Sequence, residues 1–514
     1  MGGDGGDSSS ASGGTGVGGL GGQRSDRDAG CVSRGGVDGV GCYTCPPVDI
    51  VTLETACTSA SCRPFGPRSR LTKLAADGTL PPLPGAQGSG GTTGSGGASA
   101  SGGSPAAGGA LGTGGGGAAG VACESLRSRG QVLYVTGSSA SKPFLQTIAQ
   151  QIAGQNVFIV YTSTGSCVGV DAIVNGTPMT TGASPAPATS ATYWDTSSSP
   201  GTACDLPRGG VAASLGVSDV FAQSCPGFEL VGLEGRSVVD AHGPIQTMTF
   251  VVPSNSRFSE ISAEAAYFVF GFGADSGVLD PSSSSRIWND DDLILRRNAG
   301  SGTQAMIAAA IGVPATVWKG HAGKTSDDVA ASIQAAGSDA NTADLAIGIL
   351  AADYIDTRNL RAQIRMLAFQ DTAQHCAVFP DSSATAHDKR NVRDGHYPIW
   401  SPLHLLYKGN QLGEPLDVSN RQALTDIIGY LSGTKILPNG VKLIDVYAQS
   451  GLVPECAMRV GRTQDGGNIT PRSPSTPCSC LFEAKATGST SCTPCVVQGD
   501  CGAGETCSQG YCER

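Results

Sequence analysis

The sequence predicts an α/β fold for the central part of the chain, and three observations support this prediction. Between residue 131 and about residue 455, short apolar segments alternate with segments of helical periodicity. Glycine-rich, low-complexity sequence precedes this region, and clusters of cysteine flank it at both ends. The chain has 75 glycines among 514 residues and 15% charged residues, whereas roughly 7% glycine and roughly 25% charge are usual. We therefore expect a folded core between segments that have no core of their own.

Composition divides the N-terminal part of the chain into three segments. Residues 1–30 are rich in glycine, serine and aspartate, and we expect a disordered tether because they hold too few apolar groups to offset the entropy of ordering. Residues 66–122 are a linker of glycine, proline and serine. Between them, residues 31–65 form a small module that contains five cysteines, namely Cys31, Cys42, Cys45, Cys57 and Cys62.

The odd number of cysteines in this module means that one of them pairs elsewhere or stays free. Cys42 and Cys45 form a C-x-x-C pair. A disulfide is favoured over a zinc site here, because no second pair or histidine cluster completes a set of ligands.

Residues 123–460 contain the predicted core, and five apolar segments within it are expected to be strands. These segments are 132–136, 157–161, 247–252, 293–296 and 346–350. Cys123 and Cys456 bracket the core and are candidates for a disulfide that joins its ends, although sequence spacing does not determine connectivity.

Residues 461–514 form a cysteine-rich module with few apolar groups, so disulfides must hold it together. Its cysteines are Cys478, Cys480, Cys492, Cys495, Cys501, Cys507 and Cys512. Eighteen cysteines in one chain are hard to keep reduced in the cytosol, and we expect an extracytoplasmic protein that is periplasmic, secreted or on the cell surface.

The start of the chain, MGGDGGDSSSASGG, lacks the basic and apolar regions of a signal peptide, and no apolar stretch is long enough for a membrane span. We expect this start to lie downstream of a signal or lipid-anchoring segment, and export by another route is the alternative. The net charge is −10 and no run of lysine or arginine occurs, which argues against nucleic acid or an anionic membrane as a partner.

Three predicted helix starts could hold a small anion, because the first N–H groups of a helix have no internal partner and carry partial positive charge. They lie in segments 136–154, 161–176 and 295–312. The third combines this dipole with an arginine, whose forked donors match an oxyanion. Taken alone, each hydroxyl would usually be an ordinary helix cap. The residues at these starts are Ser141, Ser166, Arg297, Ser301, Gly302 and Thr303.

Asp219, in the segment SLGVSD, could separate a phosphate site from a general anion site. Its carboxylate could accept the proton that monohydrogen phosphate carries and sulfate lacks, and it would repel an unprotonated anion. A surface or capping aspartate is the alternative interpretation of this residue.

Motifs for catalysis or metal binding are not found. The segment from Gly320 to Asp328 lacks the glycine of a Walker loop where Trp318 stands, and we expect a loop before a helix capped by Ser326. No G-x-S-x-G elbow occurs in the core. No H-E-x-x-H or other ligand spacing links the histidines, which are His242, His321, His375, His387, His396 and His404. The sequence therefore predicts no catalytic residue, no metal ligand and no cofactor.

The segments GSSASKP, YTSTGSCVGVDAI, SLGVSD, IWNDDDLILRRNAGSGTQ and YPIW occur in an order that resembles the phosphate-binding protein of bacterial ABC transporters. The resemblance covers residues 131–455, and its most specific piece is R-x-x-G-S-G-T at 297–303 after W-N-D at 288–290. It implies the two-lobed fold of type 2 periplasmic binding proteins. The lobes would comprise 131–245 plus 397–455 and 246–396, joined by two crossover strands.

By this resemblance, Ser141, Ser166 and Asp219 would contact phosphate from one lobe, and the other lobe would contribute Arg297, Ser301, Gly302 and Thr303. Three features depart from the family pattern. Lys142 replaces an aromatic residue and points either to the cleft or to solvent, and Ala299 replaces an aspartate that orients the arginine. An insertion at 177–210 is expected to form a loop tied by Cys204 to Cys167 or Cys225.

The resemblance implies a solute-binding protein without enzymatic activity, exported or lipid-anchored, whose binding serves phosphate transport, sensing or storage. Its ligand would be phosphate or a similar oxyanion, and its protein partner an ABC permease or a cell-surface protein. One alternative is a secreted phosphoesterase with Ser301 or Thr303 as nucleophile, but no base stands near these hydroxyls in sequence. Another is an adhesion protein with a degenerate cleft, which Ala299 and the long flanks favour and the retained polar residues oppose.

Overall fold

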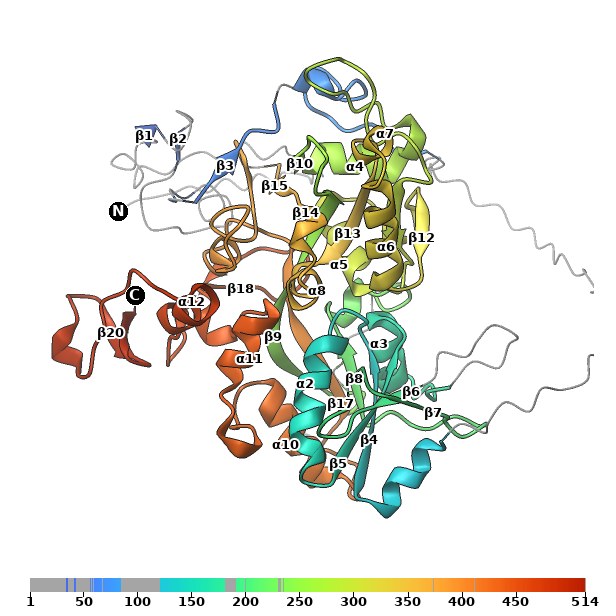
Figure 1. Cartoon of the computed structure of the whole chain (residues 1–514), viewed down its shortest axis with the longest axis vertical. Helices are drawn as coiled ribbons and strands as arrows, with labels where there is room; N and C mark the ends of the chain where they lie inside the picture. Colours follow the sequence, from blue (N-terminus) through green and yellow to red (C-terminus); the bar gives the residue numbers. More distant parts are fainter. Residues whose placement is uncertain are drawn as a thin grey trace, which may run out of the picture.

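The main part of the chain consists of two α/β lobes joined by two strands (Figure 1). The computed structural model describes residues 121–513 except 181–190, 199, 230–232, 234, 373 and 411. It also describes 60–84 except 67, and a few positions before residue 60. The predicted two-lobed α/β fold is therefore confirmed. The disorder expected for residues 1–30 and most of the glycine-rich linker lie outside the described residues.

The first lobe is built on a sheet with the strand order β5-β4-β8-β17-β9. Strand β4 is parallel to its neighbours β5 and β8, whereas β17 is antiparallel to β8. These strands are Gln131–Gly137 (β4), Val157–Ser163 (β5), Leu215–Ser218 (β8), Val238–Pro253 (β9) and Trp400–Lys408 (β17). Most of their side chains are buried, as expected when helices cover both faces of a sheet. The helices are Lys142–Ala153 (α2), Ser166–Val174 (α3), Arg421–Leu431 (α10) and Leu443–Ser450 (α11).

The second lobe repeats this order as β12-β11-β13-β9-β14. The further strands are Ile294–Arg297 (β11), His321–Gly323 (β12), Ile347–Ala351 (β13) and Ile364–Met366 (β14). All five segments predicted as strands are thus strands of one of the two lobes. The helices are Ala263–Phe272 (α4), Gly302–Ile311 (α5), Ser326–Ala336 (α6), Ala340–Ala343 (α7), Ala352–Thr357 (α8) and Arg390–Arg393 (α9).

Strand β9 belongs to both lobes, and Figure 1 shows it running from one to the other. It pairs with β17 as far as Thr247, which lies opposite Trp400, and with β13 from Met248 onwards. The chain therefore passes between the lobes near residues 247 and 400, close to the boundaries predicted from the sequence. Helices that begin after the parallel strands of each lobe face this junction.

The insertion at 177–210 is not only a loop, which corrects the prediction. Strands β6 (Ala191–Tyr193) and β7 (Thr202–Cys204) extend the sheet of the first lobe beyond β5. Cys204 pairs with Cys123, and Cys167 pairs with Cys225, so the predicted partners of Cys204 are wrong. The reason is local pairing, because the amide of Cys123 donates to the carbonyl of Asp205 beside β7.

The second lobe also binds a segment that precedes the core. Strand β3 (Cys62–Arg63) pairs with β16 (Ala377–Val378), which continues through β15 (Ala368–Gln370) to β10 (Glu260–Ser262). A disulfide joins Cys62 to Cys376, so one cysteine of the N-terminal module pairs elsewhere, which is one of the two outcomes that the odd count allows. Residues 68–84 follow along the same lobe, with Arg70 buried against the ring of Phe65.

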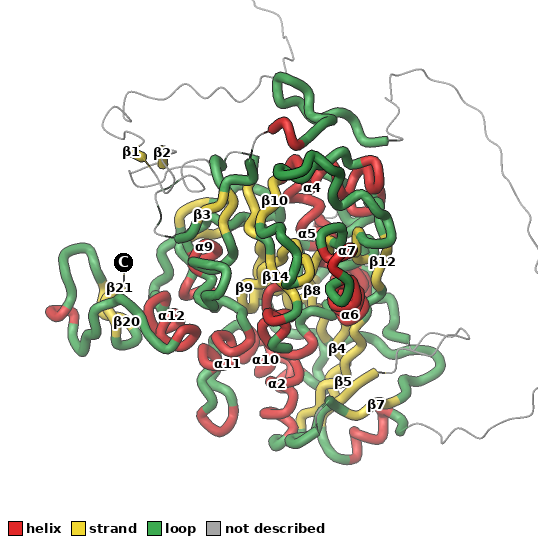
Figure 2. Tube along the Cα trace, turned by 45° about the horizontal axis from the view of Figure 1, so that its top comes forward, coloured by secondary structure: helices red, strands yellow, loops and turns green. Residues whose placement is uncertain are grey.

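The C-terminal module stands to one side of the lobes (Figure 2). It contains α12 (Ser479–Thr487) and the hairpin β20 (Thr506–Ser508) and β21 (Tyr511–Glu513), after the short pair β18 (Val460–Gly461) and β19 (Thr470–Pro471). Cys456 pairs with Cys478, so a disulfide between Cys123 and Cys456 is excluded. The predicted disulfide framework of the module is confirmed by the pairs Cys480–Cys492, Cys495–Cys507 and Cys501–Cys512.

Two buried aspartates of α8 lie in opposite electrostatic environments. Asp356 forms ion pairs with Lys389 at 2.8 Å and Arg361 at 2.5 Å, and these cations hold its pKa well below the ordinary value although burial opposes them. Burial raises the pKa of Asp353 well above its ordinary value, although Gln246 donates to both of its oxygens at 3.0 and 3.1 Å. The folded protein therefore favours the charged form of Asp356 and the neutral form of Asp353.

We expect Asp356→Asn and Asp353→Asn to change stability in opposite directions. Asp356→Asn should lower the free energy of unfolding by about 3 kcal/mol at neutral pH, because buried Lys389 and Arg361 would then share a single carboxylate, that of Asp381. Asp353→Asn should raise it by about 1 kcal/mol, because the buried charge is removed and an amide can donate to Oε1 of Gln246, which has no partner among the described residues. Because the pKa of Asp353 is raised in the folded state, the wild type loses stability as pH rises through that pKa. The stability gained by Asp353→Asn should therefore be smaller at acidic pH than at neutral pH. Thermal unfolding at acidic and neutral pH measures both effects, and equal signs at neutral pH would contradict this account.

Candidate functional site

Four helices begin at the junction between the lobes, with α2 and α3 in the first lobe and α5 and α6 in the second. Three of these starts are the predicted anion-binding segments. The fourth, α6, follows the segment from Gly320 to Asp328 and was predicted only as an ordinary helix start. Each start exposes N–H groups without internal partners, so the junction combines four positive helix ends.

The first lobe contributes a buried carboxylate held by two hydroxyls. Asp219 directly follows β8 and is only 2% exposed. Ser141 Oγ donates to its Oδ1 at 3.2 Å, and Ser166 Oγ donates to its Oδ2 at 3.1 Å. Neither hydroxyl caps its helix, and Ser166 is the first residue of α3 rather than its cap. Both hydroxyls therefore point into the junction.

The pKa of Asp219 is raised, chiefly by burial. Hydrogen bonds from Ser138, Ser166 and Ser141 and the positive charge of Arg297 oppose this rise. The carboxylate is thus a strong acceptor in a site of low dielectric, where an additional donor would stabilise its charge.

The second lobe contributes Arg297, the last residue of β11, which is also 2% exposed. Its guanidinium donates to Ser326 Oγ at 2.9 Å, to the carbonyl of Lys324 at 3.1 Å, and across the junction to Ser139 Oγ at 3.2 Å. These three neutral oxygens orient the arginine. Nε of Arg297 has no hydrogen-bond partner among the described residues.

The backbone at the start of α5 touches the first lobe directly. A Cβ atom on Gly302 would lie 2.3 Å from Ser166 Oγ and 2.8 Å from Asp219 Cβ, so only glycine fits at this position. The amide of Cys167 donates to the carbonyl of Gly300 at 3.1 Å. Ser301 precedes α5 without capping it, and Thr303 is buried in its first turn. The structure thus places all seven predicted residues where the lobes meet.

A pocket of about 250 Å³ opens beside these residues, between the lobes. Lys142 is one of its lining residues, so the interpretation in which its side chain lies at the cleft is the one the structure supports. Among the described residues no carboxylate lies within ion-pair distance of Lys142, and burial lowers its pKa. Arg358, which also lines the pocket, is paired with Asp327 at 3.0 Å. The other lining residues are Ser139, Tyr161, Ser163, Thr192, Thr325, Ser326 and Tyr354.

Sequence reasoning did not identify Ser139 and Ser326, which hold Arg297 from opposite lobes. Ser139 lies in the segment 136–154 that was predicted to bind an anion, but only Ser141 of that segment was predicted to contact it. Ser326 was predicted as a helix cap, and this was wrong, because Thr325 caps α6 in a reciprocal capping box with Asp328. The Thr325–Asp328 spacing is a recognisable signal for that box, and it frees the hydroxyl of Ser326.

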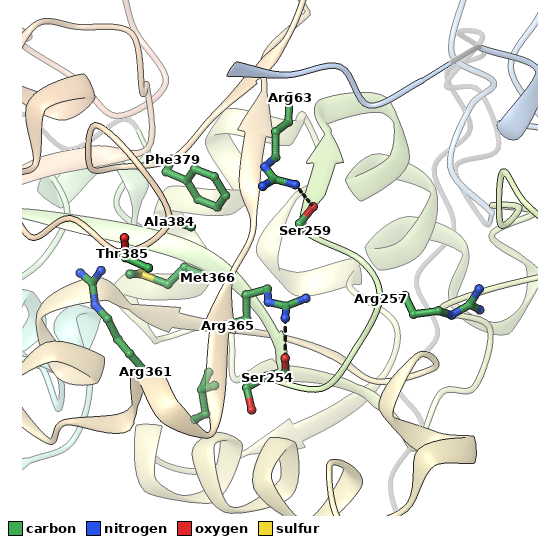
Figure 3. A pocket seen from close by; sticks show the side chains of 11 residues that line it. Arg63, Ser254, Arg257, Ser259, Arg361, Arg365, Met366, Phe379, Ala384 and Thr385 are labelled. Atoms are coloured by element: carbon green, nitrogen blue, oxygen red, sulfur yellow. Dashed lines mark hydrogen bonds between the residues drawn. The ribbon is translucent and has the colours of Figure 1, made fainter. Parts of the chain in front are cut away.

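A second pocket, of about 430 Å³, lies on the second lobe and is lined by four arginines (Figure 3). Carboxylates already pair with Arg257 and Arg361, which lie on opposite sides of the view. Arg365 donates to three backbone carbonyls, and Arg63 donates to Ser259 Oγ. Because these donors are engaged within the lobe, this pocket is less suited to an anion than the junction.

Comparison with known proteins found no matching family model and no matching curated protein. Solved structures that match include an ABC-type phosphate transport receptor from Vibrio cholerae, at 11% identity over 62% of this chain and 99% of that chain, with a TM-score of 0.36. A phosphate-binding protein from Stenotrophomonas maltophilia matches at 12% identity over 63% and 90%, with a TM-score of 0.36. PstS from Borrelia burgdorferi matches at 12% over 63% and 98%, with a TM-score of 0.33. Similarity at this level carries no argument about the ligand.

The strand order of this chain is more informative, because both lobes show the same order. In each, the second strand lies beside the first, and then come the third strand, the strand that enters from the other lobe (β17 or β9) and the fourth strand (β9 or β14). The fold is that of type 2 periplasmic binding proteins. Seven disulfides among the described residues indicate an oxidising, extracytoplasmic environment. None of the helices in the described part of the chain has the length and apolar character needed to cross a bilayer.

Proposed function

We propose that this protein is an extracytoplasmic solute-binding protein that holds phosphate between its two lobes. The observation that carries the proposal is the presence of buried Arg297 in one lobe and buried Asp219 in the other, at a junction of four helix starts. Helix ends and an arginine fork stabilise an oxyanion, and the carboxylate adds a requirement for a proton on that oxyanion.

The two serine hydroxyls that now donate to Asp219 could donate to a bound phosphate instead. Ser141 and Ser166 each have one hydroxyl proton, and both protons now point at Asp219. The oxygens of a phosphate between the lobes would accept these two hydrogen bonds in place of Asp219. Asp219 would then accept a hydrogen bond from the hydroxyl group of the ligand, so the buried carboxylate would still have a donor. A fully deprotonated anion offers no such proton and would leave the buried carboxylate facing a negative charge.

A binding role accounts for the junction better than hydrolysis does. Among the described residues, the lining of the cleft pocket includes no histidine. Ser301 or Thr303 would need a base within hydrogen-bond reach to act as a nucleophile. Asp219 is already engaged with two hydroxyls. An ABC permease or a cell-surface protein is the partner to which such a receptor would present phosphate.

Calorimetric titration of the full chain with phosphate and with sulfate, near neutral pH, tests this proposal. We expect one phosphate per chain and much weaker binding of sulfate. Absence of binding of both phosphate and sulfate would overturn the proposal and favour an adhesion protein. Steady turnover of a chromogenic phosphate ester, lost in Thr303→Val or Ser301→Ala, would instead identify a phosphoesterase.

A further inference from the structure

A second cluster of polar side chains lies on the two crossover strands. Asp240 and His242 are two residues apart on β9, so their side chains share one face of the sheet. His404 on β17 is the register partner of His242. The pairing is irregular between Pro402 and His404, and such bulges re-aim side chains near functional sites.

One ligand atom from each of these three residues lies within 4.8 Å of the others. His404 Nδ1 is 2.8 Å from Asp240 Oδ2, and the rings of His242 and His404 are 5.1 Å apart at 81°. The side chain of His404 is fully buried, that of Asp240 is 19% exposed and that of His242 is 38% exposed. The cluster is therefore closed on one side and reachable from solvent on the other.

Each imidazole also has an oxygen neighbour from outside the three residues. Glu455 Oε1 lies 3.5 Å from Nδ1 of His242, and Ser401 Oγ lies 3.5 Å from Nε2 of His404. Imidazoles that bind a metal are usually oriented in this way, by an oxygen on the nitrogen that does not bind it. Phe221 packs on the ring of His404 at 4.3 Å and shields it from water.

We propose that Asp240, His242 and His404 form a binding site for a divalent transition metal such as Zn²⁺. Two imidazoles and one carboxylate suit zinc, copper or nickel, whereas calcium and magnesium require mainly oxygen ligands. Ligand bonds of about 2.1 Å in tetrahedral geometry place ligand atoms roughly 3.4 Å apart. The residues need to move only slightly to reach this spacing, because His404 and Asp240 are now at hydrogen-bond distance.

Three protein ligands leave one position for water, for Glu455 or for an outside ligand. The metal would join β9 to β17, which are the two strands that connect the lobes. Phe221 also links the cluster to Asp219, which stands two residues before it in the chain. A metal here would therefore stiffen the connection between the lobes next to the phosphate site, and the proposal does not depend on phosphate as the ligand of the cleft.

The test is calorimetric titration of the full, disulfide-bonded chain with Zn²⁺ after dialysis against a chelator. We expect one Zn²⁺ per chain at this cluster, and Co²⁺ in its place should give the visible absorption of a tetrahedral site. His242→Ala should weaken Zn²⁺ binding by more than the roughly 10–100-fold that loss of a residue hydrogen-bonded to a metal ligand costs, because it removes one of the three ligands themselves. Its matched control is His321→Ala, which removes an exposed histidine on β12 in the other lobe and should leave binding unchanged.

Asp240→Asn is the second variant, and His404 is left intact because it is fully buried. Thermal unfolding without metal shows whether each variant folds. Binding of Zn²⁺ that is equal in wild type, His242→Ala and Asp240→Asn would overturn the proposal, since the metal would then sit elsewhere. A wild-type chain that binds none of Zn²⁺, Co²⁺ and Cu²⁺ would overturn it too.

Discussion

Arg297→Ala is expected to abolish measurable phosphate binding while leaving the lobes folded. The guanidinium is the cation that spans the junction, with hydrogen bonds to Ser326 in its own lobe and Ser139 in the other. Each charge-assisted hydrogen bond to an oxyanion contributes about 1.5–3 kcal/mol. Two such bonds correspond to a loss of affinity of roughly 100-fold to 10⁴-fold.

Calorimetry with phosphate measures this loss, and Arg296→Ala is the matched control. Arg296 is the neighbouring residue on β11 and carries the same charge, but its side chain donates to the carbonyls of Gly320 and Arg297. Its removal should change phosphate affinity by less than about tenfold, as screened charges outside a site do. Equal losses in both variants would show that only the net charge matters, and would contradict a direct contact from Arg297.

The sequence predicted the elements of this site better than their contacts. Strand and helix segments repeat a simple pattern of apolar residues, so β4, β5, β9, β11 and β13 could be placed without tertiary information. The residues that end strands and begin helices were also evident, because small and hydroxylated residues cluster there. This is why Ser141, Ser166, Asp219 and the 297–303 segment were chosen.

What the sequence could not predict depends on distances between segments far apart in the chain. Ser326 is 29 residues from Arg297, and Ser139 is 158 residues from it. No local sequence pattern indicates that the start of α6 lies beside the start of α2. The predicted disulfide between Cys123 and Cys456 is wrong for the same reason. Cys123 pairs with Cys204 of β7, and Cys456 pairs with Cys478 of the C-terminal module. The Asp240, His242 and His404 cluster depends on the register of β9 against β17, and not on a spacing along one element.

Asp219→Asn is expected to change which anion binds. A site built to accept a proton from its ligand rejects an analogue without that proton by on the order of 10⁴-fold. In the variant, the amide no longer repels sulfate and can donate a hydrogen bond to it. Phosphate loses a charge-assisted bond, which costs about 1.5 kcal/mol, or roughly tenfold in affinity. The preference for phosphate over sulfate should therefore fall by at least about 100-fold.

Parallel titrations with phosphate and sulfate measure this ratio, and Asp280→Asn is the control. Asp280 is also only 2% exposed, but it pairs with Arg257 of the second lobe at 3.0 Å. Burial raises the pKa of Asp219, so its charge costs folding stability above that pKa, and Asp219→Asn should not lower the unfolding temperature at neutral pH. A variant that folds and still prefers phosphate as strongly as the wild type would show that Asp219 does not receive the proton of the ligand. Selectivity would then have to come from the geometry of the helix starts alone.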